Sequence, residues 1–111
     1  MSFFVREQER EGTCYHEFYR GAWDENTFWK EDSLFLHDDI LCENKGFWEA
    51  IAEVIPEYDP YGDTRVSFEA WKKIGEVICR KDHGGKELYE EADAWMKDAC
   101  RRCGCVTILG V

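Results

Sequence analysis

Six cysteines carry the most reactive side chains of this sequence, and three of them, Cys100, Cys103 and Cys105, lie within a few residues of one another. Two thiolates with two residues between them can both reach one tetrahedral zinc ion, so Cys100 and Cys103 have the spacing of half a zinc site. A complete site needs a second half, and the remaining cysteines are scattered along the chain, at Cys14, Cys42 and Cys79. We therefore expect ordinary thiols, with no metal, no cofactor and, in a reducing compartment, no disulfide framework.

Histidines and carboxylates could supply acid–base chemistry, but nothing in their spacing selects a site. A nucleophile needs a base and a group that orients the base, and none of the three histidines, His16, His37 and His83, lies in a local catalytic signature. The 24 acidic residues can be paired in many ways, so they single out no hydrolytic pair. The sequence thus favours a binding protein over an enzyme, and a small enzyme or metal-binding protein stays open as an alternative.

The acidic residues are concentrated in one part of the chain. The net charge is −10, and residues 21–63 account for all of it, with twelve acidic and two basic residues. The flanking segments, 1–20 and 64–111, carry net charges of −1 and +1. Such segregation predicts a negative field on one side of the fold, which repels nucleic acid and anionic membranes and attracts basic protein surfaces. A solvated acidic surface without a partner is the alternative.

The segments that must position these side chains are predicted from periodicity. Residues 13–20 alternate with period two, which is typical of a strand, and Gly12 suits the connection before it. We expect a β-hairpin over residues 2–20 and a further short strand over 33–36. Residues 105–110 are almost continuously apolar, which is typical of a central strand buried on both faces.

Apolar residues then recur at helical spacing. Three helices are predicted, over residues 43–55, 67–82 and 86–103. Phe47 and Ile51 lie on one face of the first, and Pro56 ends it because a proline disfavours helical backbone in the residue before it. Ser67 is a suitable N-cap for the second helix.

Strands that are segregated from helices predict an α+β fold. The N-terminal hairpin and the C-terminal strand would lie in a mainly antiparallel sheet, packed against about three helices. A chain of 111 residues is the size of one domain, 1–111. The residues expected together in its core are Trp71, Ile74, Trp95 and Ile108.

The first residues lack the basic start and apolar run of a secretion signal. No stretch reaches the roughly 20 apolar residues that span a bilayer. We therefore expect a cytoplasmic protein.

Three segments resemble one family of proteins. The stretch from Val54 to Thr64, VIPEYDPYGDT, followed by FEAW at Phe68–Trp71, is similar to small bacterial immunity-type proteins of polymorphic and contact-dependent toxin systems. The ending VTILGV is similar to the ending of the same group. The resemblance implies a cytoplasmic inhibitor that binds a toxin domain, for example a basic nuclease. Cys100–Cys105 is not part of the pattern.

The acidic segment is accordingly the predicted partner-binding region. Its carboxylates would steer a basic partner and its aromatics would be the anchors. The candidate binding residues are Trp23, Asp24, Glu25, Trp29, Glu31, Asp32, Asp38, Asp39, Glu57, Asp59 and Asp63. The alternative from another class is an interaction module that mimics nucleic acid by its charge.

Overall fold

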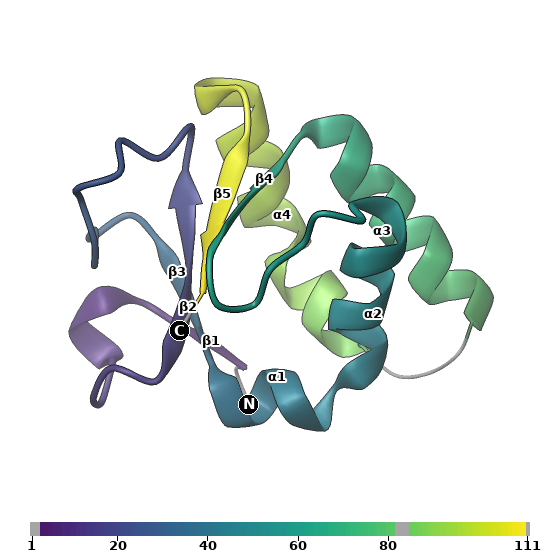
Figure 1. Cartoon of the computed structure of the whole chain (residues 1–111), viewed down its shortest axis with the longest axis horizontal. Coiled ribbons are helices and arrows are strands. Elements are labelled where there is room, and N and C mark those ends of the chain that lie inside the picture. The colour runs from purple at the N-terminus through teal and green to yellow at the C-terminus, as the bar shows by residue number, and fades with distance from the viewer. Residues whose placement is uncertain (1–2, 82–84, 111) are drawn as a thin grey trace.

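The computed structural model describes residues 3–81 and 85–110 and has an α+β fold, in which an antiparallel sheet packs against helices (Figure 1). His83 and Gly84 lie outside the described residues. The strands are β1 (Phe4–Val5), β2 (Tyr15–Arg20), β3 (Leu34–His37), β4 (Asp63–Val66) and β5 (Val106–Leu109). The helices are α1 (Asp38–Glu43), α2 (Lys45–Val54), α3 (Phe68–Lys81) and α4 (Lys86–Cys103), with a short 3-10 helix, η1 (Glu7–Glu9).

The strands form a single five-stranded sheet in the order β1-β3-β2-β5-β4, and all neighbours are antiparallel. The central strand β2 pairs with β3 on one side and with β5 on the other. Strand β5 is therefore interior, and all four of its residues are buried. The predicted fold class, the antiparallel sheet and the buried C-terminal strand are confirmed.

The predicted hairpin over residues 2–20 is wrong in its pairing. Strand β1 does not contact β2 as a neighbour, because β3 lies between them and pairs Phe4 with Leu36. Two physical causes are visible. The nine residues between β1 and β2 form η1 and an extended return rather than a tight turn. Both edges of β2 are occupied, by β3 and β5, so β1 pairs at the outer edge of β3 instead.

Besides η1, helix α1 and strand β4 were not predicted from periodicity. Helix α1 has only six residues, too few for an apolar stripe to show, and it begins where His37 Nδ1 accepts a hydrogen bond from the N–H of Asp39 at 3.0 Å. Strand β4 is an edge strand whose exposed and buried residues alternate over four positions. Its exposed residues, Asp63 and Arg65, are charged, so the strand resembles a continuation of the turn before it.

The three predicted helices are present as α2, α3 and α4. Ser67 caps α3 as expected, since its Oγ accepts a hydrogen bond from the N–H of Ala70 at 3.1 Å. Helix α2 ends before Pro56, with Ile55 in an extended conformation. Gly85 has φ 86 and approaches α2 so closely that a Cβ there would lie 2.5 Å from the backbone nitrogen of Phe47. Only glycine fits this junction.

The main core lies between the sheet and the helices. Phe18, Leu36 and Ile108 point from the sheet to one side, where they join residues of α2, α3 and α4 in one cluster. The four residues predicted to share the core are all buried in it, at 0% exposure for Trp71 and Ile74, 2% for Ile108 and 8% for Trp95. This prediction is confirmed.

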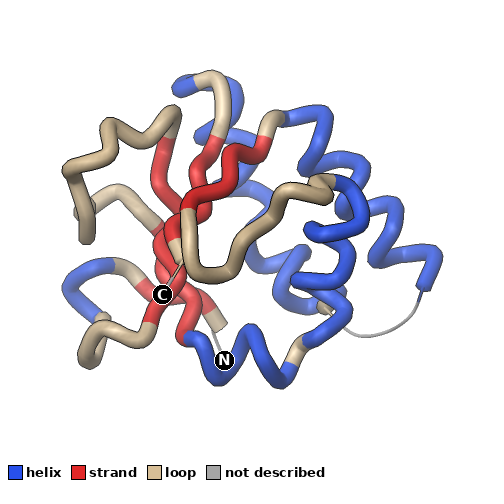
Figure 2. The backbone as a smooth tube through the Cα atoms, viewed as in Figure 1, coloured by secondary structure: helices blue, strands red, loops and turns tan. Residues whose placement is uncertain are grey.

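The opposite face of the sheet is covered by irregular chain. Residues 21–33, called here the loop layer, and η1 lie on the side of the strands away from α2, α3 and α4 (Figure 2). Beneath them the sheet presents Glu17, Phe35 and Thr107, which are almost completely buried. The sheet is therefore covered on both faces, and the acidic segment supplies one of the covers.

Candidate functional site

The loop layer is attached to the sheet through Glu17. Its carboxylate accepts hydrogen bonds from the backbone N–H of Trp29 at 2.7 Å and of Lys30 at 3.0 Å, and from the hydroxyl of Ser33 at 2.7 Å. Glu17 is 2% exposed, and a buried carboxylate is tolerated when donors surround it. Glu17 is thus a structural residue that fixes the position of the loop layer.

The two tryptophans predicted as anchors are used inside the fold. The ring of Trp29 stacks on the ring of Phe35, with the two centroids 5.6 Å apart. The guanidinium of Arg10 lies over the Trp29 ring, 3.9 Å from its centroid. Trp23 donates its indole N–H to the carbonyl of Thr27 at 2.7 Å. Both tryptophans are half-buried, so neither presents a free ring to a partner.

The carboxylates of the loop layer are exposed to solvent. Asp24, Glu25, Glu31 and Asp32 are all exposed. The hydroxyl of Thr27 and then backbone N–H groups bind the Asp24 carboxylate and lower its pKa to about 2. Its hydrogen bonds shape the local turn, so this group belongs to the loop's own structure.

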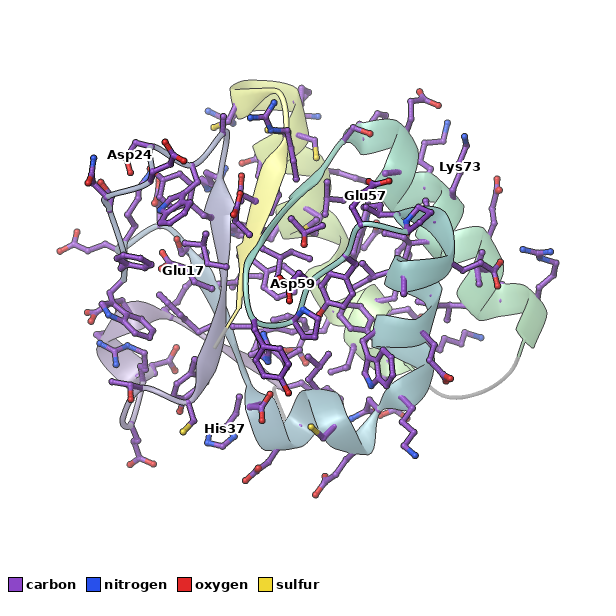
Figure 3. The ribbon with its side chains drawn as sticks, viewed as in Figure 1. Glu17, Asp24, His37, Glu57, Asp59 and Lys73 are labelled. Carbon is purple, nitrogen blue, oxygen red and sulfur yellow. The ribbon has the colours of Figure 1, made fainter. Side chains whose placement is uncertain are left out.

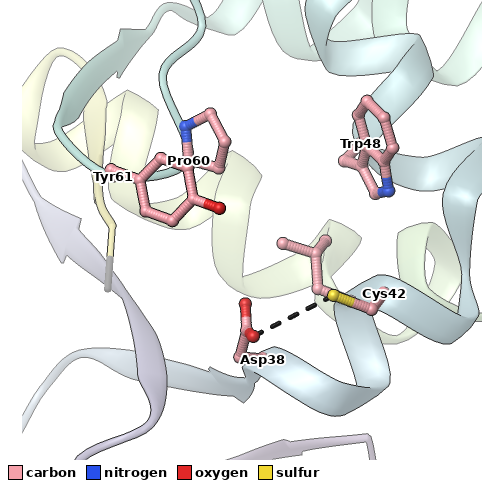
Figure 4. A pocket seen from close by; sticks show the side chains of 6 residues that line it. Asp38, Cys42, Trp48, Pro60 and Tyr61 are labelled. Carbon is pink, nitrogen blue, oxygen red and sulfur yellow. Dashed lines mark hydrogen bonds between the residues drawn. The ribbon is translucent and has the colours of Figure 1, made fainter.

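A second group of predicted residues surrounds a hollow near α1. The α1 hollow, of about 250 Å³, is lined by Asp38, Leu41, Cys42, Trp48, Pro60 and Tyr61. Helices α1 and α2 and the turn before β4 each contribute to it. In Figure 4, Pro60 and Tyr61 lie across the hollow from Trp48, with Asp38 and Cys42 below them. Tyr61 is 82% exposed, the largest exposure of any large apolar side chain in the described residues.

Further carboxylates lie close to this hollow. Asp39 follows Asp38 on α1 and its side chain is 83% exposed. Asp59 and Asp63 flank Tyr61 in the sequence and are exposed. Glu57 is also exposed, but in Figure 3 it lies apart from Asp59, towards α3. Figure 3 shows that Asp59 lies well apart from Asp24 on the molecule. The eleven predicted binding residues therefore do not form one surface, and of these eleven only Asp38 lines the α1 hollow.

The electrostatic effect of these carboxylates is seen on two neighbours. Burial raises the pKa of Tyr58 to about 12, and the charges of Asp38 and Asp59 contribute to the shift. Desolvation and then the charges of Asp38 and Asp39 raise the pKa of the Cys42 thiol. Burial is the main cause of both shifts, and the negative charges around the hollow add to it.

A buried histidine, His16, forms a hydrogen bond with the Asp38 carboxylate. His16 is 1% exposed, and its Nε2 donates to Asp38 Oδ1 at 2.8 Å. The Sγ of Cys42 lies 3.9 Å from Asp38 Oδ2. The carboxylate stands between thiol and imidazole, so the histidine is not placed to take the proton of Cys42. With its raised pKa, Cys42 is a neutral thiol near pH 7, and the thiolate is the nucleophilic form.

The cysteine cluster does not form a metal site in the structure. Cys100 is buried and its Sγ lies 3.9 Å from the carbonyl oxygen of Val66, whereas Cys103 is exposed. Within residues 3–81 and 85–110, no group of three or more histidine, cysteine or acidic side chains could hold a metal ion. All six cysteines are free thiols.

Two residues of the α1 hollow, Trp48 and Tyr61, were missed as candidates from the sequence. Trp48 follows Phe47 directly and so lies off the apolar stripe of α2, which is a signal that the core covers its ring only in part. Tyr61 lies between Pro60 and Gly62 in a turn, where an aromatic side chain has no strand or helix to bury it. An aromatic residue at a turn-forming position is the signal that could have identified it.

The chain matches no protein-family model, no curated protein and no solved structure. Among the helices of the described residues, none has the length and apolar character needed to cross a bilayer. The geometry and charge of the α1 hollow are therefore the basis for proposing a function.

Proposed function

We propose that this protein binds and inhibits a basic protein partner, in the manner of an immunity protein that neutralises a toxin domain. The observation that carries the proposal is Tyr61, an 82% exposed aromatic side chain at the edge of a hollow and among carboxylates. Tyrosine is enriched among the residues that dominate binding energy at protein interfaces. An exposed tyrosine beside a concave surface is therefore well suited to anchor a partner.

Charge supports the same surface. Asp38, Asp39, Asp59 and Asp63 lie on or next to the elements that form the hollow. Exposed carboxylates of this kind speed the encounter with a basic partner and disfavour acidic ones. The proposed division of work is that the carboxylates set the association rate, while Tyr61 and the hollow slow dissociation.

Binding rather than catalysis is proposed because the reactive groups near the hollow are poorly placed for chemistry. His16 is buried behind Asp38, and a raised pKa keeps Cys42 as a thiol. The six free thiols fit a reducing compartment. We therefore propose that the partner is met in the cytoplasm.

The test is co-expression with the product of the neighbouring gene, read out as rescue of growth and as a complex that co-purifies. The decisive variant is Asp39→Lys with Asp63→Lys, which reverses two exposed charges and leaves the buried contact of Asp38 with His16 intact. The matched control is Glu76→Lys with Glu90→Lys on α3 and α4, which changes the net charge equally.

The α1-side pair is expected to weaken the complex by about tenfold or more at low salt, with the loss mainly in the association rate. Added salt should shrink the difference, because the screening length is about 10 Å at 0.1 M. The control pair should change affinity by less than about threefold, which is equivalent to about 0.6 kcal/mol. Equal losses from both pairs would mean that only net charge matters and that the α1 side is not the binding surface. Glu91 is unsuitable as a control because its carboxylate accepts the N–H groups of Phe3 and Phe4.

A further inference from the structure

Only one oxygen of the Asp38 carboxylate accepts a strong hydrogen bond from the protein itself. One oxygen, Oδ1, accepts the hydrogen bond from His16 Nε2, and the other, Oδ2, has the sulfur of Cys42 at 3.9 Å, which is a weak contact. Within the described part of the chain, no lysine or arginine forms an ion pair with Asp38. The side chain is 42% exposed and lines the α1 hollow. One carboxylate oxygen is thus available to a donor that enters the hollow.

The walls of the hollow suit the body of a cationic side chain. Trp48 and Tyr61 supply aromatic rings, and Leu41 and Pro60 supply aliphatic surface. A cation is attracted to the face of an aromatic ring, most strongly to tryptophan. The volume of about 250 Å³ is below the roughly 300–1,000 Å³ of pockets for drug-sized molecules, and it suits one side chain better than a whole ligand.

Among cations, the guanidinium group fits this combination best. It is planar, stacks on aromatic rings and is more weakly hydrated than an ammonium group. It also carries several donors and so can bind the free oxygen of Asp38 while it stacks. Lysine offers a compact, strongly hydrated charge that loses more on leaving water.

The chain has a second hollow with the opposite lining. It has a volume of about 260 Å³ and is lined by Phe68, Lys97, Cys100 and Arg101. It combines an aromatic ring with two cationic side chains and no carboxylate. The difference between the two hollows makes charge, rather than concavity or aromatic character, the property that distinguishes the α1 hollow.

We infer that the α1 hollow is a receptor for one arginine side chain of the partner protein, with Asp38 as the anion and Trp48 and Tyr61 as the walls. This inference rests on the proposed function and adds to it the chemistry that the partner must present. His16 is a positioning residue, since its hydrogen bond fixes the direction in which Asp38 presents its free oxygen. The partner should therefore carry an exposed arginine at the centre of its interface.

The test uses the whole chain and a small probe, the blocked amino acid N-acetyl-arginine amide. The probe is titrated while the indole N–H resonance of Trp48 is followed by NMR, assigned with the Trp48→Phe variant. Blocked citrulline, which has the same shape without the charge, is the neutral control, and blocked lysine tests the preference for guanidinium. Saturable shifts at Trp48 with arginine, weaker ones with lysine and none with citrulline are expected.

Two variants test the named residues. Asp38→Asn should weaken binding of the arginine probe by about tenfold or more, because it removes the charge opposite the guanidinium. Tyr61→Ala should weaken it several-fold. Because Tyr61 is 82% exposed, this substitution removes little core packing and leaves the fold intact. Glu90→Gln on α4 is the matched control and should leave the affinity unchanged. Resonances of residues beside Lys97 and Arg101 should not shift.

The outcomes separate this inference from the proposed function. Citrulline binding as tightly as arginine, or no saturable shift with arginine while the partner complex still depends on Asp39 and Asp63, overturns the arginine receptor and leaves the proposed function standing. Saturable arginine binding that is lost in Asp38→Asn, combined with a partner complex unaffected by the Asp39 and Asp63 reversals, supports the cation site and overturns the proposed binding surface.

Discussion

The carboxylate of Glu17, on the central strand, accepts the backbone N–H of Trp29 at 2.7 Å and holds that residue in a left-handed conformation with φ 59. A bulky residue rarely adopts this conformation because its Cβ approaches its own carbonyl oxygen. The contact therefore joins two unusual features, a buried carboxylate and a strained tryptophan. Together they fix the loop layer on the face of the sheet that the helices leave open.

Replacement of Glu17 by glutamine tests this contact. The glutamine side chain has the same size as glutamate but is uncharged, and its NH₂ group is itself a donor. It would face the three donors that bind the Glu17 carboxylate, so hydrogen bonds to a charged group are lost. We expect the free energy of unfolding to fall by about 1.5–3 kcal/mol. Urea denaturation measures the change, and Glu57→Gln at an exposed site should cost less than about 0.5 kcal/mol. Equal effects of the two substitutions would show that Glu17 does not hold the loop layer.

Backbone strain at Trp29 is tested by comparing glycine with alanine. Both substitutions remove the ring, but only glycine adopts φ 59 without steric cost. Trp29→Gly should therefore be more stable than Trp29→Ala by about 1 kcal/mol, measured by denaturant unfolding. At the neighbouring Phe28, which does not have positive φ, the order should reverse because glycine makes the unfolded chain more flexible. The same order at both positions would contradict a strained Trp29.

The lowered pKa of Asp98 predicts that the stability of the fold decreases at low pH. Hydrogen bonds from Arg102 and then Arg20 lower its pKa from 3.8 to about 2. Because the folded state holds the proton less tightly, the contribution of Asp98 to stability is present above about pH 4 and is lost as the pH falls towards 2. Thermal denaturation of Asp98→Asn should accordingly show a smaller decrease in Tm over this range than the wild type. An unchanged decrease in Tm would contradict the role of Asp98.

The reactivity of the Cys42 thiol should depend on the charge of Asp38. Desolvation and then the charge of Asp38 raise the pKa of the Cys42 thiol, so Asp38→Asn should increase the thiolate fraction at a fixed pH near neutrality. Alkylation of Cys42 by iodoacetamide, followed by mass spectrometry of its peptide, should become several-fold faster. Cys103, which is exposed and distant in the sequence, is the internal control and should react at an unchanged rate. A rate at Cys42 that does not rise would argue against a strong negative potential in the hollow.

The sequence predicted those helices and strands whose apolar residues follow a regular pattern and are buried. Trp71 and Ile74 on α3 and the apolar run of β5 are of this kind, and the structure buries them as expected. The pairing of β1 was not predictable from its two residues. It depends on β3, which has one edge free for β1 once its other edge has paired with β2, and no local pattern in β1 encodes that partner.

The candidate site was predictable only in its charge. Asp38, Asp39 and Asp59 were identified because acidic residues can be counted along a segment. The hollow itself is formed by side chains of α1, α2 and the turn before β4, which only the fold brings together. Trp48 and Tyr61 left weaker signals, because an aromatic residue outside a periodic stripe has no element that predicts its position.

The position of β5 has a consequence for how the chain folds. Strand β5 lies between β2 and β4 in the sheet, so β2, which comes early in the chain, has no partner on that side until residues 106–109 have been synthesised. During synthesis the edge of β2 is therefore exposed, and unpaired strand edges favour aggregation. Closing a sheet through contacts so distant in sequence is also slow compared with helix packing. The nascent chain thus has an interval in which a chaperone that shields the open edge of β2 would improve its yield.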